Sequence, residues 1–264
     1  MELVVLGSGT CVPEAERGPS GYAVRAPGGI VLLDGGSGTV GRIVAAGLDI
    51  REVGAWLFTH RHPDHTADLV PFLFSRKHGW GRGPRSVRFG PDPGMPRPLE
   101  IRGGERFPVF FDSLMAIFGT WCLEETGPVL CREVPPETAP FDLLGLTVRA
   151  FPVAHSDPAV AYRLQDPDGR VLCYSGDTDL CAGIVEAARG ADLLLIECSM
   201  PDDRKVAGHL RPSEVAAIAH ASGARRVLLT HIYPVAPRDR IREACENALG
   251  RPVELAYDGM RLEV

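Results

Sequence analysis

Short runs of four to six mostly apolar residues, separated by turns rich in Gly, Pro and Asp, recur along the chain. Runs of this length predict strands, because helices need longer periodic segments. Most of the runs are apolar at consecutive positions, which is typical of strands buried on both faces. We expect strands over residues 3–6, 21–25, 30–34, 54–59, 146–151, 159–164, 170–175, 192–197 and 226–231.

Longer segments between these strands predict helices. Pro212 suits the first turn of the helix expected near the C-terminus, and Gly223 suits its end. Residues 167–169 predict a turn between two adjacent strands, and Asp258-Gly259 predicts the turn of a final hairpin. The expected helices cover residues 39–46, 67–76, 108–118, 183–189 and 212–222.

Several of the predicted strands end in an ionisable side chain, or are followed by one. Strand ends on one edge of a sheet converge, so these groups are expected to share one cleft. A random globular chain would not place six such groups in this way. They are Asp34, His60, His155, Asp177, Glu197 and His231.

The stretch His60-Arg61-His62-Pro63-Asp64-His65 packs three of the eight histidines and one carboxylate into six residues. In an extended backbone His60 and His62 point the same way, because side chains alternate with period two. Pro63 then bends the chain, so that Asp64 and His65 can face a second point nearby. Imidazoles and a carboxylate aimed at two neighbouring points suit a pair of ions such as Zn²⁺ or Mn²⁺.

Asp34 has two interpretations on local sequence. It ends an apolar strand and precedes Gly35-Gly36, so it could cap the helix expected at 39–46. It could instead orient a metal-bound histidine through a hydrogen bond. The residues alone do not choose between these roles.

The composition is that of an ordinary soluble globular protein, with 264 residues, 45% hydrophobic and 23% charged. A net charge of −6 excludes a nucleic-acid binder of the basic kind. The first residues read as a strand rather than a signal peptide, and no apolar run approaches a membrane span. The seven cysteines are scattered without a Cys-x-x-Cys pair, which favours a reduced, cytoplasmic protein.

Residues 76–106 differ from the rest of the chain, since they are rich in Gly and Pro and carry eight basic but three acidic residues. We expect one domain over 1–264, with this stretch as an excursion from it. The excursion is either a solvated surface segment or a flap that draws anionic substrates to the metal site.

In order and context, the motif residues resemble those of the metallo-β-lactamase superfamily. The resemblance rests on residues 59–65, His155, Gly176-Asp177-Thr178 and Leu229-Thr230-His231. Glu197, Gly208-His209 and the opening Gly7-Ser8-Gly9-Thr10 resemble the ribonuclease Z-like branch, which includes phosphodiesterases. The resemblance covers essentially the whole chain. It implies a four-layer αββα sandwich with a dinuclear metal site at one edge.

Carried over residue by residue, the resemblance implies two divalent metal ions, with zinc as first choice and manganese or iron as alternatives. His60, His62 and His155 would hold the first ion, and Asp64, His65 and His231 the second. Asp177 would bridge both, and Asp64 also belongs to the expected catalytic set. His209 with Glu197 resembles a proton-donating pair, and Asp34 resembles an aspartate that supports a ligand histidine.

The expected activity is that of a phosphodiesterase on a small or cyclic, anionic phosphodiester. Relatives that cut tRNA precursors carry a long arm between the equivalents of His155 and Asp177, whereas 21 residues intervene here. Arg211 also stands where that branch often has Ser or Thr. Because the long arm is missing and the net charge is acidic, a tRNA 3′-processing endonuclease is less favoured, and RNA stays an open partner.

Three further alternatives remain beside that activity. The first is a lactonase, thioesterase or arylsulfatase-like hydrolase that uses the same metal site. The second is an inactive binding protein on this scaffold. The third, an oxygen-reducing di-iron protein, is disfavoured because such relatives have glutamate where this chain has His62. No membrane partner is expected, and a homodimer is allowed.

Overall fold

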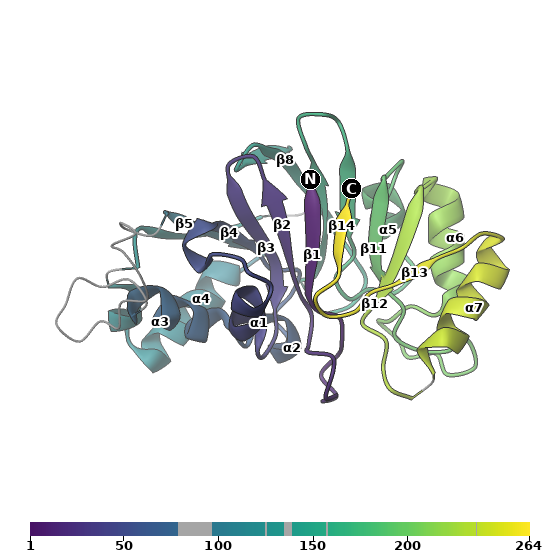
Figure 1. Ribbon diagram of the computed structural model, residues 1–264, viewed down its shortest axis with the longest axis horizontal. Coiled ribbons are helices and arrows are strands. Elements are labelled where there is room, and N and C mark those ends of the chain that lie inside the picture. Colours follow the sequence, from purple (N-terminus) through teal and green to yellow (C-terminus); the bar gives the residue numbers. More distant parts are fainter. Residues whose placement is uncertain (79–96, 125, 135–138, 157, 236) are drawn as a thin grey trace.

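Two mixed β-sheets lie face to face between two layers of helices (Figure 1). The computed structural model describes residues 1–78, 97–124, 126–134, 139–156, 158–235 and 237–264. Among these residues, each sheet has seven strands. The αββα sandwich expected from the sequence is thereby confirmed.

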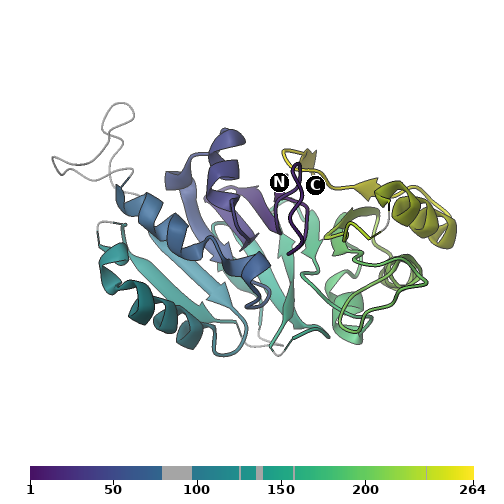
Figure 2. The same ribbon diagram turned by 90° about the horizontal axis from the view of Figure 1, so that it is seen from below.

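The first sheet is built mainly from the N-terminal half of the chain and takes one strand from the C-terminus. Its order is β14-β1-β2-β3-β4-β5-β6. The strands are β1 (Glu2–Gly7), β2 (Gly21–Ala26), β3 (Gly29–Gly35), β4 (Val53–Leu57), β5 (Leu99–Gly103), β6 (Val129–Glu133) and β14 (Arg261–Glu263). Helices α1 (Thr39–Ala45), α3 (Leu69–His78) and α4 (Phe107–Phe118) cover its outer face (Figure 2).

The second sheet has the order β13-β12-β11-β10-β9-β8-β7. Its strands are β7 (Phe141–Leu143), β8 (Leu146–Pro152), β9 (Val160–Gln165), β10 (Val171–Tyr174), β11 (Leu193–Glu197), β12 (Arg226–Thr230) and β13 (Glu254–Leu255). Helices α5 (Ala182–Ala187), α6 (Pro212–Ser222) and α7 (Arg238–Leu249) cover the outer face of this sheet. A one-turn helix α2 (Pro63–Thr66) and two 3₁₀ turns, Ile50–Glu52 and Thr120–Leu123, complete the elements.

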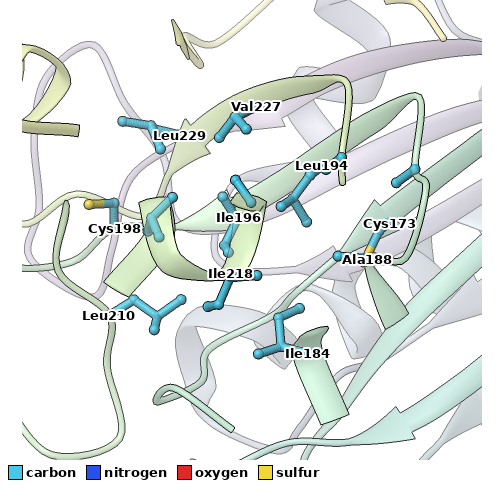
Figure 3. Packing of buried hydrophobic residues seen from close by; sticks show 14 of the residues in the cluster. Cys173, Ile184, Ala188, Leu194, Ile196, Cys198, Leu210, Ile218, Val227 and Leu229 are labelled. Carbon is cyan, nitrogen blue, oxygen red and sulfur yellow. The ribbon is translucent and has the colours of Figure 1, made fainter. Parts of the chain in front are cut away.

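The continuous apolar strands are explained by burial on both faces. In β1, Val5 faces the opposite sheet and Val4 faces the helices, as period-two alternation requires. In β11, Leu195 likewise packs between the sheets and Leu194 packs under the helices. Figure 3 shows the second arrangement, in which Ile218 of α6 packs beside the strand residues.

Parallel pairing puts several strand ends on one edge. In the second sheet the strands from β10 to β13 pair in parallel with their neighbours. In the first sheet the strands from β3 to β6 do the same. The carboxyl ends of parallel strands lie at the same edge, where the loops that follow them can meet. Asp34 and Glu197 lie at the ends of β3 and β11. The other candidates at these ends come shortly after β4, β10 and β12, and they are His60, Asp177 and His231.

The expected strands all exist with ends shifted by one or two residues, and so do the five expected helices. The Asp258-Gly259 hairpin was wrong, because β13 pairs with β12 and β14 pairs with β1 in the other sheet. Helix α7 was missed, although Ile241, Cys245 and Leu249 form a buried stripe four residues apart. β5, β6 and β7 were missed as well.

Among the described residues, no helix is both long and apolar enough to cross a bilayer. The seven cysteines are all free thiols. Much of the basic excursion, residues 79–96, lies outside the described residues, so the flap stays a prediction.

Arg76, at the start of that excursion, is part of the core. It is fully buried, and its guanidinium donates to the backbone oxygens of Ile50 at 3.3 Å, Val53 at 3.0 Å and Thr126 at 3.2 Å, and to that of Arg97. Burial lowers the pKa of Arg76 to about 10, so the group stays charged at neutral pH. One side chain thereby joins the end of α3 to three separate loops.

We expect Arg76→Met to destabilise the fold by about 2–4 kcal/mol, because several buried carbonyl oxygens lose their donor. Arg132→Met is the matched control, since the side chain of Arg132 in β6 is 56% exposed, and should cost about 0.5 kcal/mol or less. Urea unfolding of both variants measures the difference. Equal losses would show that the carbonyl contacts of Arg76 contribute little.

Candidate metal centre

The stretch from His60 to His65 changes from extended chain to helix within three residues. β4 ends at Leu57, and His62 still has an extended backbone with φ −61° and ψ 147°. Pro63 takes the first position of α2, where its fixed φ fits and no backbone N–H is needed. The bend indicated by the sequence is therefore present. Because of it, the side chains of Asp64 and His65 leave a helical turn, whereas that of His62 leaves extended chain.

Asp177, in the loop after β10, lies at the centre of a group of four imidazoles. Its Oδ1 is 3.4 Å from Nε2 of His65 and 3.6 Å from Nε2 of His231. Its Oδ2 is 3.7 Å from Nε2 of His155 and 3.9 Å from Nε2 of His60. A carboxylate with imidazole nitrogens on both of its oxygens has the arrangement of a bridging ligand.

The remaining candidates lie on either side of this carboxylate. Nδ1 of His62 is 3.2 Å from Nε2 of His155, and Oδ2 of Asp64 is 3.4 Å from Nε2 of His231. Among the described residues, ligand-type atoms within 4.8 Å of one another form five groups of three that could hold an ion, and two of these groups are the expected triads. The triads are His60, His62, His155 and Asp64, His65, His231.

Three buried atoms of the cluster lack any hydrogen-bond partner among the described residues. They are Nε2 of His60, Nε2 of His65 and Oδ1 of Asp177. An unpaired buried polar atom costs about 1–3 kcal/mol, so three at one point call for a missing partner. Because all three are good ligands for Zn²⁺, the cluster fits a metal centre.

Asp34 is linked to one histidine of each triad. In both histidines the linked atom is Nδ1, the ring nitrogen that does not face Asp177. Nδ1 of His65 donates to Asp34 at 2.8 Å. Nδ1 of His60 faces the hydroxyl of Thr59 at 3.0 Å, and that hydroxyl donates to Asp34 at 2.7 Å. Such contacts fix the tautomer, so that Nε2 of both rings carries the lone pair that faces the ions.

His231 and His155 are held in the same manner from the second sheet. Nδ1 of His231 faces Oγ of Ser199 at 3.1 Å, and Oγ donates to Glu197 at 2.6 Å. Nδ1 of His155 donates to the carbonyl oxygen of Gly208 at 2.9 Å. In both rings Nε2 is again the nitrogen turned toward Asp177.

Asp34 contacts His65, as the second of the two roles that the sequence allowed requires. Besides His65 and Thr59, it accepts a hydrogen bond from the hydroxyl of Tyr174 at 2.6 Å. The start of α1 is capped by another residue, Asp68, which accepts from the backbone N–H of Gly38 and Val40.

Asp34 and His231 also share a rare backbone conformation. Their φ angles are 50° and 51°, in the left-handed region that costs non-glycine residues about 1–3 kcal/mol. Both side chains are buried and hydrogen-bonded, so the surrounding contacts hold the strained backbone in place.

Burial, together with the nearby imidazole of His65, holds the pKa of His60 well below its usual range. Burial also lowers the pKa of His62. For His65 burial acts in the same sense, but Asp177 and Asp34 raise its pKa well above the usual value. Neutral His60 and His62 can accept an ion directly, whereas His65 must release a proton to bind one.

His209 and Glu197 form a second pair beside the cluster. Nδ1 of His209 lies 3.1 Å from Oε1 of the fully buried Glu197. The His209 ring centroid is 4.8 Å from that of His155 and 5.9 Å from that of His231. Burial lowers the pKa of His209, but the hydrogen bond to Glu197 raises it above the ordinary value. Since Nδ1 is engaged, Nε2 is the nitrogen left to exchange a proton.

A large apolar cavity lies on the other side of α2. It has a volume of about 620 Å³ and is lined by Pro63, Thr66, Phe74, Phe118 and Trp121, among others. Asp64 and His65 on the same helix belong to the candidate metal cluster. The cavity and the cluster are therefore lined by different residues of α2.

The sequence reasoning missed three hydroxyls that organise the cluster: those of Thr59, Tyr174 and Ser199. Thr59 stands directly before His60, and Ser199 stands two residues after Glu197. These spacings carried a weak signal, because Ser and Thr are common at strand ends. The Tyr174 contact depends on the packing of the two sheets and has no local signal.

The chain belongs to the metallo-β-lactamase superfamily, whose β-lactamase superfamily domain matches residues 31–232. It is accordingly a metal-dependent hydrolase, as the sequence predicted.

Among its relatives, ribonuclease Z from Mycobacterium sp. (strain KMS) is 32% identical over the whole chain and 96% of the relative's length. Ribonuclease Z from Myxococcus xanthus (strain DK1622) is 30% identical over the whole chain and 98% of the relative's length.

Solved structures share the fold at lower identity. The metallo-β-lactamase fold protein YhfI from Bacillus subtilis has a TM-score of 0.81 at 22% identity, over all of this chain and 99% of that one. The short form of human tRNase Z has a TM-score of 0.76 at 24% identity, also over all of this chain and 99% of that one. A diphosphatase of the PhnP family has a TM-score of 0.71 at 21% identity, over all of this chain and 97% of that one.

We expect Tyr174→Phe to weaken zinc binding about tenfold, because Asp34 loses one of the donors that orient it toward His65. Tyr162→Phe is the matched control: Tyr162 is equally buried, but its hydroxyl donates to the carbonyl of Phe58. Both changes should cost about 1 kcal/mol of folding stability. Competition with a chromophoric chelator measures the affinities. An equal loss of affinity in both variants would contradict a specific effect through Asp34.

Proposed function

We propose that the protein is a dinuclear metal-dependent phosphodiesterase that acts on a small or cyclic phosphodiester. The observation that carries the proposal is the buried Glu197 with His209, held 3.1 Å apart beside a complete set of metal-ligand side chains. Hydrolysis of a phosphodiester releases an alkoxide or phenolate, which needs a proton. Esters and lactones also release an oxyanion, so turnover of each substrate class must separate these activities.

In the proposed site each triad would hold one ion, and Asp177 would be a ligand shared by both. Zinc suits the imidazole-rich donor set best, with manganese or iron as alternatives. Bound ions of this kind lower the pKa of a coordinated water and neutralise charge on phosphoryl oxygens.

Protonation of the leaving group is the part of the reaction that these residues supply. As a water oxygen bonds to phosphorus and gives up its proton to solvent, the bond from phosphorus to the leaving oxygen breaks with its electron pair on that oxygen. The proton on Nε2 of His209 is transferred there, and Glu197 stabilises the charged imidazole before transfer and keeps its orientation afterwards. Protonation of this kind is worth about 10²–10⁴-fold in rate.

A small substrate is favoured over tRNA by two features of the chain. Residues 160–174, which are most of the 21 residues between His155 and Asp177, form β9, β10 and the tight turn that joins them. The net charge of −6 opposes binding of a long polyanion. The names of the curated relatives make tRNA 3′-end cleavage the competing activity, and esters or lactones come next.

The experiment loads chelated protein with Zn²⁺ or Mn²⁺, counts the metal by elemental analysis and compares substrates. We expect about two ions per chain and turnover of bis(p-nitrophenyl) phosphate and a cyclic nucleotide that chelation abolishes. Faster cleavage of a tRNA precursor would replace the proposal with RNA processing. Turnover of lactones or aryl esters alone would move the substrate class to carbon centres.

We expect His209→Ala to lower kcat for diphenyl phosphate about 100-fold while the metal content stays unchanged. The loss on bis(p-nitrophenyl) phosphate should be much smaller, because p-nitrophenolate leaves without help. His220→Ala, at an exposed position of α6 away from the cluster, is the control and should behave as the wild type. An equal loss on both esters would remove His209 from the role of proton donor.

A further inference from the structure

The loop between β11 and α6 carries both His209 and a lysine, Lys205, that makes three hydrogen bonds. The ammonium of Lys205 lies 2.6 Å from Oδ1 of Asp179, 2.6 Å from Oε2 of Glu214 and 2.6 Å from the carbonyl oxygen of His209. An ammonium has three N–H donors, so these three acceptors use all of them. Each acceptor belongs to a different part of the site.

Asp179 connects Lys205 to the metal cluster. It follows Asp177 by two residues, and its backbone N–H donates to the carbonyl of Ala154, the residue before His155. Its second carboxylate oxygen accepts from the N–H of Gly208 at 3.0 Å. The aspartate therefore joins the loop of one ligand to the peptide that precedes His209.

Glu214 connects Lys205 to a rigid helix. It lies in the first turn of α6 and accepts from the backbone N–H of Arg211 at 3.2 Å, in a capping-box arrangement. The helix itself is anchored through residues such as Ile218, which Figure 3 shows against the strands of the second sheet. One end of the contact is thus fixed by the core.

We propose that Lys205 is a positioning residue that sets the place of the His209 imidazole relative to the leaving group, without taking part in metal binding. The inference rests on the proposed function, since it assigns Lys205 to the proton-donating step. Ion pairs at partly exposed positions contribute little to stability, and the Lys205 side chain is 27% exposed. Misplacement of a reacting group by about 1 Å, in contrast, can cost about 100-fold in rate.

The test uses metal-loaded protein and two esters that differ in their need for a proton. The measured quantity is the ratio of kcat for diphenyl phosphate to kcat for bis(p-nitrophenyl) phosphate. We expect Lys205→Met to lower this ratio at least about tenfold, with metal content and melting temperature unchanged. Arg204→Met, an exposed neighbour in the same loop, is the matched control and should keep the wild-type ratio.

The double variant Lys205→Met with His209→Ala separates positioning from a general effect. If Lys205 acts through His209, the double variant should have the same ratio as His209→Ala alone. A further drop in the double variant, an equal loss on both esters, or a loss of metal from Lys205→Met would overturn the inference. A normal ratio in Lys205→Met beside a reduced one in His209→Ala would overturn it while leaving the proposed function intact. A normal ratio in His209→Ala would instead reject the proton-donor role itself.

Discussion

Two buried carboxylates, one near the end of a strand in each sheet, govern the geometry of the cluster. Each accepts a hydrogen bond from one imidazole directly and orients a second imidazole through a hydroxyl group. The two sets are Asp34 with His65 and, through Thr59, His60, and Glu197 with His209 and, through Ser199, His231. These two side chains therefore orient three of the four rings around Asp177, together with the ring of His209.

Such carboxylates are expensive to bury unless several donors surround them. The carboxylate of Asp34 accepts hydrogen bonds from the backbone N–H and the hydroxyl of Thr59 and from the ring of His65. It also accepts one from the hydroxyl of Tyr174, which belongs to the opposite sheet. The Tyr174 ring packs 5.0 Å from that of Tyr22 between the sheets. Packing between the two sheets thus fixes the hydroxyl of Tyr174, which orients the carboxylate of Asp34. That carboxylate in turn orients the ring of His65. Placement of the metal ligands consequently depends on the inter-sheet core.

The parts of this arrangement that follow from local sequence were predictable, and those that need two sheets were not. The apolar runs located the strands, and parallel pairing explains why Asp34, Glu197 and His231, far apart in the chain, reach one edge. The short motif from His60 to His65 indicated two ion positions because Pro63 bends the chain at a known place. The pairing of β14 escaped prediction, because nothing in three residues shows that they pair with β1 of the first sheet and not with the strand just before them.

The helix-cap alternative for Asp34 failed for a related reason. Capping is a local property, and Asp68 satisfies it from thirty residues away by folding back onto the start of α1. Only the tertiary structure shows that Asp68 caps α1 and that the carboxylate of Asp34 hydrogen-bonds to His65 instead. Residues whose role depends on which partner arrives from elsewhere cannot be assigned from the neighbouring sequence.

One peptide group links the metal cluster to the proton donor. The carbonyl of Gly208 accepts from Nδ1 of His155, and the same peptide continues into His209. Gly208 has φ 85°, and a Cβ there would lie 3.1 Å from Nδ1 of His155, so glycine is required for the close approach. Any rotation of this peptide moves the tautomer-fixing contact of a ligand and the donor imidazole together. Because no sheet register holds that loop, its side-chain contacts must supply the precision that strand pairing supplies to the other ligands.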